Sequence, residues 1–241
     1  MLQDIKELYG DTLAATDGEI GHVRDFYFDD KKWVIRYLVA DTGTWLTGRL
    51  VLISPRAFGR LDQAGRTLHI NLARKQIEGC PSIESHMPVS RRYEVEYHRY
   101  YGWPEYWSGG AMSGLGGFPM VLPHSQDELE AQVQHNRRDD KHLQAVSSVT
   151  GFHIQTVDGV VGHVSGFLVD DESWEISSLV AEAGHWYSGK EIRISPDKVE
   201  RVSFEESTVF VSLTKADIQR TAEDHLAHAF GEQNGAGSFL D

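Results

Sequence analysis

Apolar and polar residues alternate along much of the chain in the way that is typical of half-buried strands. The turn signal Asp17-Gly18 opens a segment rich in β-branched and aromatic residues. Further on, Trp174 and Ile176 alternate with Glu175, which predicts a strand with one buried face. Segments of the same kind lie at residues 49–55, 66–72, 190–196 and 207–213. The pattern therefore predicts many short strands joined by tight turns.

The same pattern occurs twice. A shift of 141 residues aligns residues 10–77 with residues 151–218 without a gap. About a third of the aligned positions are identical, which indicates two copies of one unit of about 70 residues. The shared elements include Asp-Gly at 17–18 and 158–159, Gly-His-Val at 21–23 and 162–164, Asp-Asp at 29–30 and 170–171, and Ser-Pro at 54–55 and 195–196.

Each copy is expected to form a small β-barrel, because five or six short strands without intervening helices favour a barrel over a parallel sheet. The fold class is therefore mainly β, with two tandem barrels. We expect the first domain at 1–78, a connector at 79–145 and the second domain at 146–219. The end of a short C-terminal α-helix and a tail follow at 220–241, and Thr214 is expected to cap that helix with Asp217 as its reciprocal partner.

The repeated glycines and tryptophans are interpreted as structural residues that shape turns and close the barrels. They are Gly18, Gly21, Trp33, Gly43, Trp45, Gly48, Gly159, Gly162, Trp174, Gly184, Trp186 and Gly189. The stretch from Gly184 to Lys190 is one residue short of a phosphate-binding loop. Such a loop needs Ser or Thr after its lysine and a helix after that, whereas Glu191 follows here and begins an expected strand. We therefore interpret the stretch as a hairpin turn.

The connector is unusually aromatic. Tyr93, Tyr97 and Tyr100 recur at helical spacing, which predicts a short amphipathic helix that ends near Gly102. The rings either pack on the barrels or form a partner-binding patch, because Tyr, Trp and Arg are enriched at interface hot spots. A stacking platform for single-stranded nucleic acid is the least favoured use. The candidate partner-binding residues are Tyr97, Tyr100, Tyr101, Trp103, Tyr106 and Trp107.

The repeated motifs resemble those of the PRC-barrel family, which includes the cytoplasmic part of the photosynthetic reaction centre H subunit and a domain of ribosome maturation factors. The resemblance rests on DGEIGHVRDFYFDD from residue 17, WVIRYLVADTG from residue 33 and VSLTKADI from residue 211. It covers roughly residues 5–78 and 146–219. It implies a barrel used as an adaptor or assembly module, often without catalysis, and it assigns no catalytic residue.

Composition narrows the classes of partner. The net charge of −13 argues against broad contact with nucleic acid or anionic lipid, since both require a basic surface. The single cysteine, Cys80, is typical of a reducing compartment, so a cytoplasmic location is expected. No apolar run approaches the roughly 20 residues that span a bilayer, so no membrane span is expected.

Twelve histidines raise the question of a metal site. His225 and His228 lie near Asp224, but no established ligand motif is present, and His22 and His163 recur at an expected barrel rim. No nucleophile–base set is recognisable either. We therefore expect no catalytic residue, cofactor or metal, and a non-catalytic protein that binds a protein partner, which includes the possibility of a second copy. The alternative is a small-molecule- or metal-binding regulator that uses these histidines.

Overall fold

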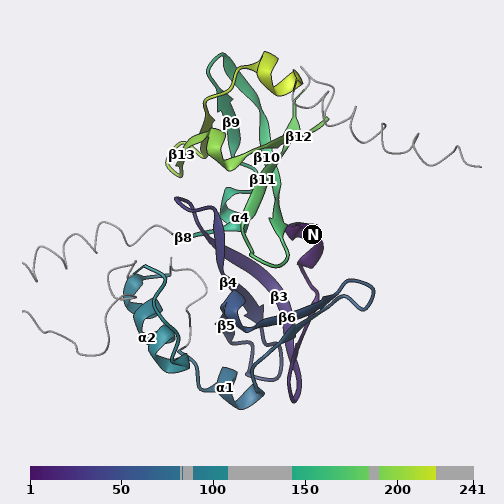
Figure 1. The fold of residues 1–241 in the computed structure, drawn as a ribbon, viewed down its shortest axis with the longest axis vertical. Coiled ribbons are helices and arrows are strands. Elements are labelled where there is room, and N and C mark those ends of the chain that lie inside the picture. Colours follow the sequence, from purple (N-terminus) through teal and green to yellow (C-terminus); the bar gives the residue numbers. More distant parts are fainter. Residues whose placement is uncertain (82, 84–88, 108–142, 185–189, 221–241) are drawn as a thin grey trace, which may run out of the picture. The chain divides into compact units, whose positions relative to one another are not determined.

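The structure is a computed structural model in which residues 1–81, 83, 89–107, 143–184 and 190–220 are described (Figure 1). The sequence elements are mostly β-strands, as the alternating pattern predicted. In the first half they are β1 (Leu2–Asp4), η1 (Ile5–Leu8), β2 (Thr12–Ala15), β3 (Gly18–Asp29), β4 (Val34–Asp41), β5 (Leu50–Ile53), η2 (Pro55–Ala57), β6 (Phe58–Asp62), β7 (Thr67–Ile70), α1 (Arg74–Glu78) and α2 (Arg91–Tyr101).

The second half repeats the first from β1 to β7. It contains β8 (Leu143–Ala145), α4 (Val146–Val149), β9 (His153–Thr156), β10 (Gly159–Asp170), β11 (Ile176–Ala183), β12 (Glu191–Ile194), η4 (Pro196–Lys198), β13 (Val199–Ser203) and β14 (Thr208–Val211). Residues 215–220 are helical, and Thr214 and Asp217 cap them reciprocally as expected, with Asp217 N donating to Thr214 Oγ1 at 3.2 Å and Thr214 N to Asp217 Oδ2 at 3.1 Å. The rest of the expected C-terminal helix lies outside the described residues.

Each repeat forms one sheet, and the two sheets have the same strand order. The orders are β5-β4-β3-β2-β7-β6 and β12-β11-β10-β9-β14-β13. The pairs β2–β7 and β9–β14 are parallel, whereas the other pairs whose register is known are antiparallel, so both sheets are mixed. This confirms a mainly β fold with two tandem domains of one type. Hydrogen bonds between the described strands do not close either sheet.

The first strand of each repeat pairs with the long strand of the other repeat. β1 pairs with β10 in the register Leu2↔Asp170, and β8, which lies 141 residues after β1, pairs with β3. The compact units of the chain follow this exchange. One unit (unit 1) contains residues 1–9, 28–35 and 145–241, and the other (unit 2) contains residues 10–27 and 36–144. The domain boundaries at residues 78 and 145 stay a prediction.

The hairpin tip at residues 28–35 belongs to unit 1 because its backbone pairs reciprocally with the matching tip of the second repeat. Trp33 O accepts a hydrogen bond from Ile176 N at 2.7 Å, and Trp174 O accepts one from Ile35 N at 2.9 Å. Both tryptophans have left-handed backbone, with φ of 54° and 59°. Their repetition in the sequence therefore reflects an unusual turn conformation that both hairpins adopt.

The Gly-His-Val motif has a steric origin in both repeats. A Cβ atom added to Gly21 would lie 2.0 Å from the carbonyl oxygen of Asp41, and one added to Gly162 would lie 2.0 Å from that of Glu182. No side chain fits at such a distance. The neighbouring strands β3 and β4, and β10 and β11, can thus approach closely only because these residues are glycines.

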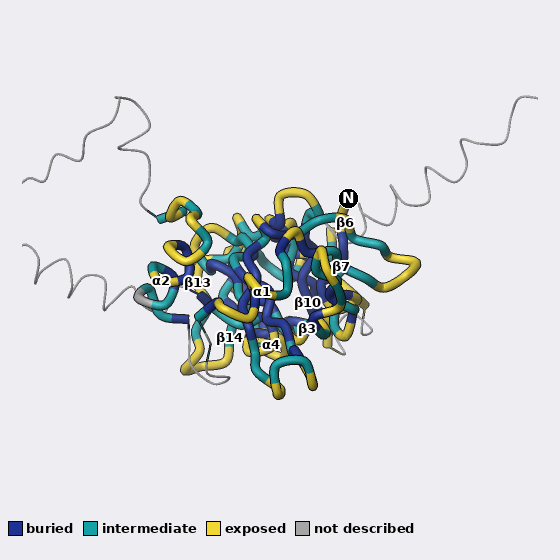
Figure 2. Tube along the Cα trace, turned by 90° about the horizontal axis from the view of Figure 1, so that it is seen from below, coloured by how far each residue is buried: buried dark blue, intermediate teal, exposed yellow. Residues whose placement is uncertain are grey.

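The buried residues lie largely on the long strands (Figure 2). In unit 2 the core includes Leu13, Ile20, Phe26, Leu38 and Leu68. In unit 1 it includes Ile154, Val164, Phe167, Leu179 and Val209, which repeat these positions with the same spacing. Each sheet therefore buries its own apolar face, as the alternation of residues predicted.

The glycine contact generates a stability prediction. Gly21→Ala is expected to destabilise the protein by at least about 3 kcal/mol, because the strands must separate to admit the methyl group. Gly10→Ala is the control, since Gly10 also has positive φ (77°) but has no atom within 4 Å of an added Cβ, and it should cost only about 1 kcal/mol. Urea unfolding followed by circular dichroism measures both. Equal losses in the two variants would contradict the steric explanation.

Candidate functional site: the aromatic helix and its buried carboxylate

Helix α2 is delimited by two recognisable caps. Ser90 Oγ accepts a hydrogen bond from Tyr93 N at 3.2 Å, which satisfies one free N–H of the first turn. Gly102 ends the helix with left-handed backbone (φ 67°), and Trp103 N donates to His98 O at 2.9 Å. The helix that the tyrosine spacing predicted is therefore confirmed, together with its end at Gly102.

The helix packs on β4 and β5 of the first repeat because these strands present apolar side chains to it. Tyr97 joins a buried cluster with Tyr37, Val39, Leu52, Val89 and Leu143. At the positions that correspond to Tyr37 and Leu52, the second repeat has Ser178 and Arg193. Polar residues at these positions remove the apolar surface that α2 needs. The difference explains why the chain provides such a cover for the first repeat.

Tyr97 anchors the helix and is itself fully buried. Its hydroxyl accepts a hydrogen bond from Ser54 N at 3.0 Å, and its ring meets Tyr37 edge-on with 5.3 Å between the centroids. Burial raises the pKa of Tyr97 well above its usual value, so the hydroxyl stays protonated. Of the candidate partner-binding residues, Tyr97 thus offers no surface to a partner.

A fully buried carboxylate, Glu94, lies beside this anchor. Its Oε1 accepts hydrogen bonds from Tyr37 Oη at 3.2 Å and from Tyr106 Oη at 2.5 Å, and its Oε2 lies 2.8 Å from Arg91 Nη1. Burial, followed by the charge of Glu94, raises the pKa of Tyr106. Because a buried charge is costly unless it is paired and hydrogen-bonded, these three partners together hold Glu94 in place.

His98 extends this network. Its Nδ1 lies 3.0 Å from Pro104 O and its Nε2 lies 3.2 Å from Tyr37 Oη, and the side chain is buried. The carbonyl can only accept, so Nδ1 carries a proton and Nε2 of the neutral ring is an acceptor. The single hydroxyl proton of Tyr37 is therefore shared between His98 and Glu94. Burial lowers the pKa of His98, against an opposing effect of the hydrogen bond to Pro104 O.

The remaining aromatic candidates keep part of their surface exposed. Two arginines lie over the rings that follow the helix: Arg36 Cζ is 3.9 Å from the centroid of Tyr106, and Arg91 Cζ is 4.2 Å from that of Trp107. The hydroxyl of Tyr100 donates to Gln76 O at 2.8 Å while 43% of this residue remains exposed. We define the connector surface as Tyr100, Tyr101, Trp103, Tyr106 and Trp107, all of which are exposed or half-buried.

The repeated glycines and tryptophans of the loops before β5 and β12 occupy turn positions where the structure describes them. Gly43 and Gly48 have φ of 50° and 76°, and Arg74 lies 4.7 Å above the ring of Trp45. Gly18 and Gly159 open the long strands with positive φ. In the second repeat, Gly184 N donates to Val161 O at 3.0 Å, while Trp186 and Gly189 lie outside the described residues. The stretch from Gly184 to Lys190 connects two strands, as the hairpin interpretation requires.

The histidines considered for a metal site are exposed where the structure describes them. His22 lies on β3, and His163 on β10 is 3.5 Å from Glu182 Oε2. Within the described ranges, no group of three or more His, Cys, Asp or Glu side chains is arranged to hold a metal ion. Asp224, His225 and His228 lie outside those ranges. Cys80 is buried, and burial raises the pKa of its thiol.

Sequence reasoning missed Glu94 and His98, which are the polar centre of the site. Their four-residue spacing on a predicted helix was a usable signal, because residues at i and i+4 share a face. The tyrosine pattern drew attention instead. In the part of the chain that the structure describes, no helix has the length and apolar character needed to cross a membrane.

The buried carboxylate leads to a second stability prediction. Glu94→Gln should destabilise the protein by about 2–4 kcal/mol, because it leaves the charge of Arg91 uncompensated beside the buried hydroxyls. Glu96→Gln provides the control on the same helix, since Glu96 is exposed, and should change the stability by less than about 0.5 kcal/mol. Chemical denaturation measures both variants. A loss at Glu94 as small as that at Glu96 would show that the network is not needed.

His98 leads to a pH prediction. Its pKa is lowered in the folded state, so the unfolded chain binds more protons as the pH falls below about 6.5, and stability should decrease there. Because other histidines also titrate, the measurement compares the unfolding free energy of the wild type and of His98→Gln between pH 8 and pH 5, both rough limits chosen around that pKa. The variant should lose less stability on acidification. A parallel pH dependence in both proteins would refute the role of His98.

The comparisons with known proteins agree with this architecture. Residues 4–77 match the model of the PRC-barrel domain family. No curated protein matches the chain. The match spans β1 to β7, and the second repeat has the same order of elements from β8 to β14. Through residues 4–77, and with its repeated β architecture, this chain belongs to the PRC-barrel family.

Proposed function

We propose that the protein is a non-catalytic adaptor or assembly module that binds a protein partner through the connector surface. PRC-barrel domains are generally non-catalytic, and an adaptor role is consistent with the family. The observation that carries the proposal is the structure of the connector. It presents two tryptophans and three tyrosines, together with Arg36 and Arg91, in a small region of unit 2.

The connector surface is suited to binding because it is held in place from below. Tyr97 and Glu94 attach α2 to β4 and β5, and the residues after the helix are attached through Tyr106 and His98. Side chains that are already ordered lose little conformational freedom when a partner binds, so more of the contact energy appears as affinity. Aromatic rings and arginines are also the residues that most often dominate interface energies.

The charge of the chain supports a protein as the partner. A net charge of −13 disfavours nucleic acid, whose phosphates would be repelled. A second copy of the chain is the other protein partner that we consider, because the exposed rings are able to pack against each other across a twofold axis. We place the protein in the cytoplasm on the basis of its single cysteine, which is typical of a reducing compartment.

The experiment that tests this function removes two exposed rings. Trp107→Ala combined with Tyr100→Ala should lower the recovery of the native partner at least tenfold, which corresponds to the loss of one interface hot spot or about 2 kcal/mol. The measurement is quantitative mass spectrometry of material captured from the native host, together with light scattering to detect self-association.

The control is Trp45→Ala combined with Tyr9→Ala, which removes rings of the same types outside the connector. Both double variants are first compared with the wild type by circular dichroism. If the connector variant retains its fold and captures the same proteins in the same amounts as the wild type, the connector surface is not the binding site.

A further inference from the structure

The two repeats provide an internal comparison of the same surface in covered and uncovered form. In the first repeat, Ser54 and Arg36 are covered by the connector: Ser54 N donates to Tyr97 Oη, and Arg36 lies over Tyr106. Their counterparts, 141 residues later, are Ser195 and Ser177. Neither of these is covered by a helix in the part of the chain that the structure describes.

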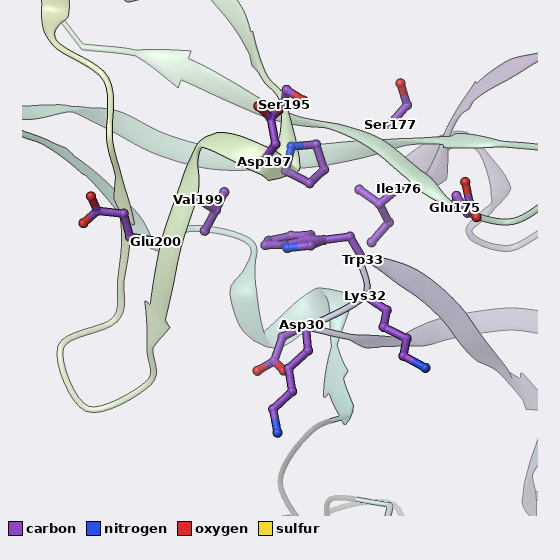
Figure 3. Close-up of a pocket in the computed structure, with 12 residues that line it drawn as sticks. Asp30, Lys32, Trp33, Glu175, Ile176, Ser177, Ser195, Asp197, Val199 and Glu200 are labelled. Carbon is purple, nitrogen blue, oxygen red and sulfur yellow. The ribbon is translucent and has the colours of Figure 1, made fainter. Parts of the chain in front are cut away.

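In unit 1, Ser177 and Ser195 line an open hollow of about 750 Å³. Figure 3 shows the indole of Trp33 in the middle of this hollow, with Asp197 and Val199 on one side and Asp30 and Lys32 on the other. Both serines are accessible to solvent. Among the described residues, no group accepts a hydrogen bond from Ser195 N, whereas the matching N–H of Ser54 is bonded to the tyrosine hydroxyl.

The charges around the two surfaces are opposite. In the first repeat the surface contains Arg36 and Arg56, and the helix that covers it brings the carboxylate of Glu94. In the second repeat, Asp197 replaces Arg56. The hollow in unit 1 is lined by four carboxylates (Asp30, Glu175, Asp197 and Glu200) and only two lysines (Lys31 and Lys32). A segment that covers this hollow must therefore carry positive charge.

Trp33 favours the same kind of occupant. Its ring is half-buried and is supported from within unit 1 by Phe28, which stacks on it with 5.6 Å between the centroids. An indole is the aromatic group that attracts a guanidinium or ammonium ion most strongly. Carboxylates on the rim add to this attraction, and the hollow as a whole is suited to an arginine or lysine side chain.

We propose that the hollow around Trp33 binds a basic segment of a partner protein that also carries a tyrosine. In this arrangement the basic side chains lie against Trp33, Glu175 and Glu200, and the tyrosine hydroxyl accepts a hydrogen bond from Ser195 N, as Tyr97 does from Ser54 N in the first repeat. The site lies in unit 1 and does not include the connector surface, so it is a second binding site beyond the proposed function.

The test uses the full chain and short fluorescent alanine-based helical peptides. The first peptide carries arginines and one tyrosine. In the second, glutamates replace the arginines, and in the third, alanine replaces the tyrosine. Fluorescence anisotropy measures affinity, and the indole N–H resonance of Trp33, assigned from its absence in Trp33→Phe, reports the place of binding. The first peptide should bind most tightly and shift this resonance, the third should bind several-fold more weakly, and the glutamate peptide should not bind.

Two variants of the protein test the contacts. Glu175→Gln combined with Glu200→Gln should weaken binding of the first peptide roughly five- to tenfold. The matched control, Glu191→Gln combined with Glu205→Gln, removes the same charge from exposed positions outside the hollow and should change the affinity less than about twofold. Ser195→Pro removes the N–H at a residue whose φ of −68° proline accommodates, and should remove the advantage of the tyrosine.

Several results would overturn the proposal. Equal binding of the arginine and glutamate peptides, an equal effect of both glutamine pairs, or binding that leaves the Trp33 resonance unchanged would each exclude a basic partner in this hollow. If no peptide binds and Glu175→Gln with Glu200→Gln instead abolishes self-association, the occupant is a second copy of the chain. Circular dichroism of each variant confirms that the fold is intact before binding is measured.

Discussion

The long strands β3 and β10 are the constraint on which the rest of the structure depends. β10 pairs with β11 along most of its length, with β9 over its first residues and with β1 over its last. A strand of twelve residues is long enough to serve all three partners. The missing side chain at Gly162 lets the carbonyl of Glu182 lie against the strand, and the register shifts beside this point. Gly21 has the same part in the first repeat.

The length of these strands also explains the exchange between repeats. The part of β10 beyond its pairing with β9 leaves an edge with unpaired backbone groups, which a strand of the chain must cover. β1 covers it, and β8 pairs with β3 in the same way. The first strand of each repeat thus belongs to the sheet of the other. A duplicated sequence has in this case produced units that are each completed by residues from both repeats.

Duplication preserved the scaffold, whereas the outer surfaces have diverged. The cores use apolar residues at matching positions, and the turn tryptophans have matching backbone angles. On the outer face, by contrast, Tyr37 and Leu52 correspond to Ser178 and Arg193. The first surface is covered by α2, whose carboxylate Glu94 is buried against three donors. The second has an acidic hollow instead. Substitutions on one face can thus change what a unit binds without any cost to its core.

The sequence by itself determined the repeat, the strand pattern, the turn positions and the helix that ends at Gly102. All of these follow from local rules, because alternation, turn residues and helix caps act over a few neighbouring residues. The same rules identified the aromatic connector but did not distinguish its anchor from its surface. Tyr97 and Tyr100 have similar surroundings in the sequence, and one is buried while the other is 43% exposed.

Only the tertiary structure decided which residues from distant parts of the chain meet. The contact of Glu94 with Tyr37 joins residues 57 positions apart, and the pairing of β1 with β10 joins the N-terminus to the second repeat. No local pattern contains this information, because the free energy of a buried carboxylate or of an exchanged strand depends on partners that folding brings together. The hollow around Trp33 likewise arises where two hairpin tips pair, and the sequence showed there only a repeated tryptophan.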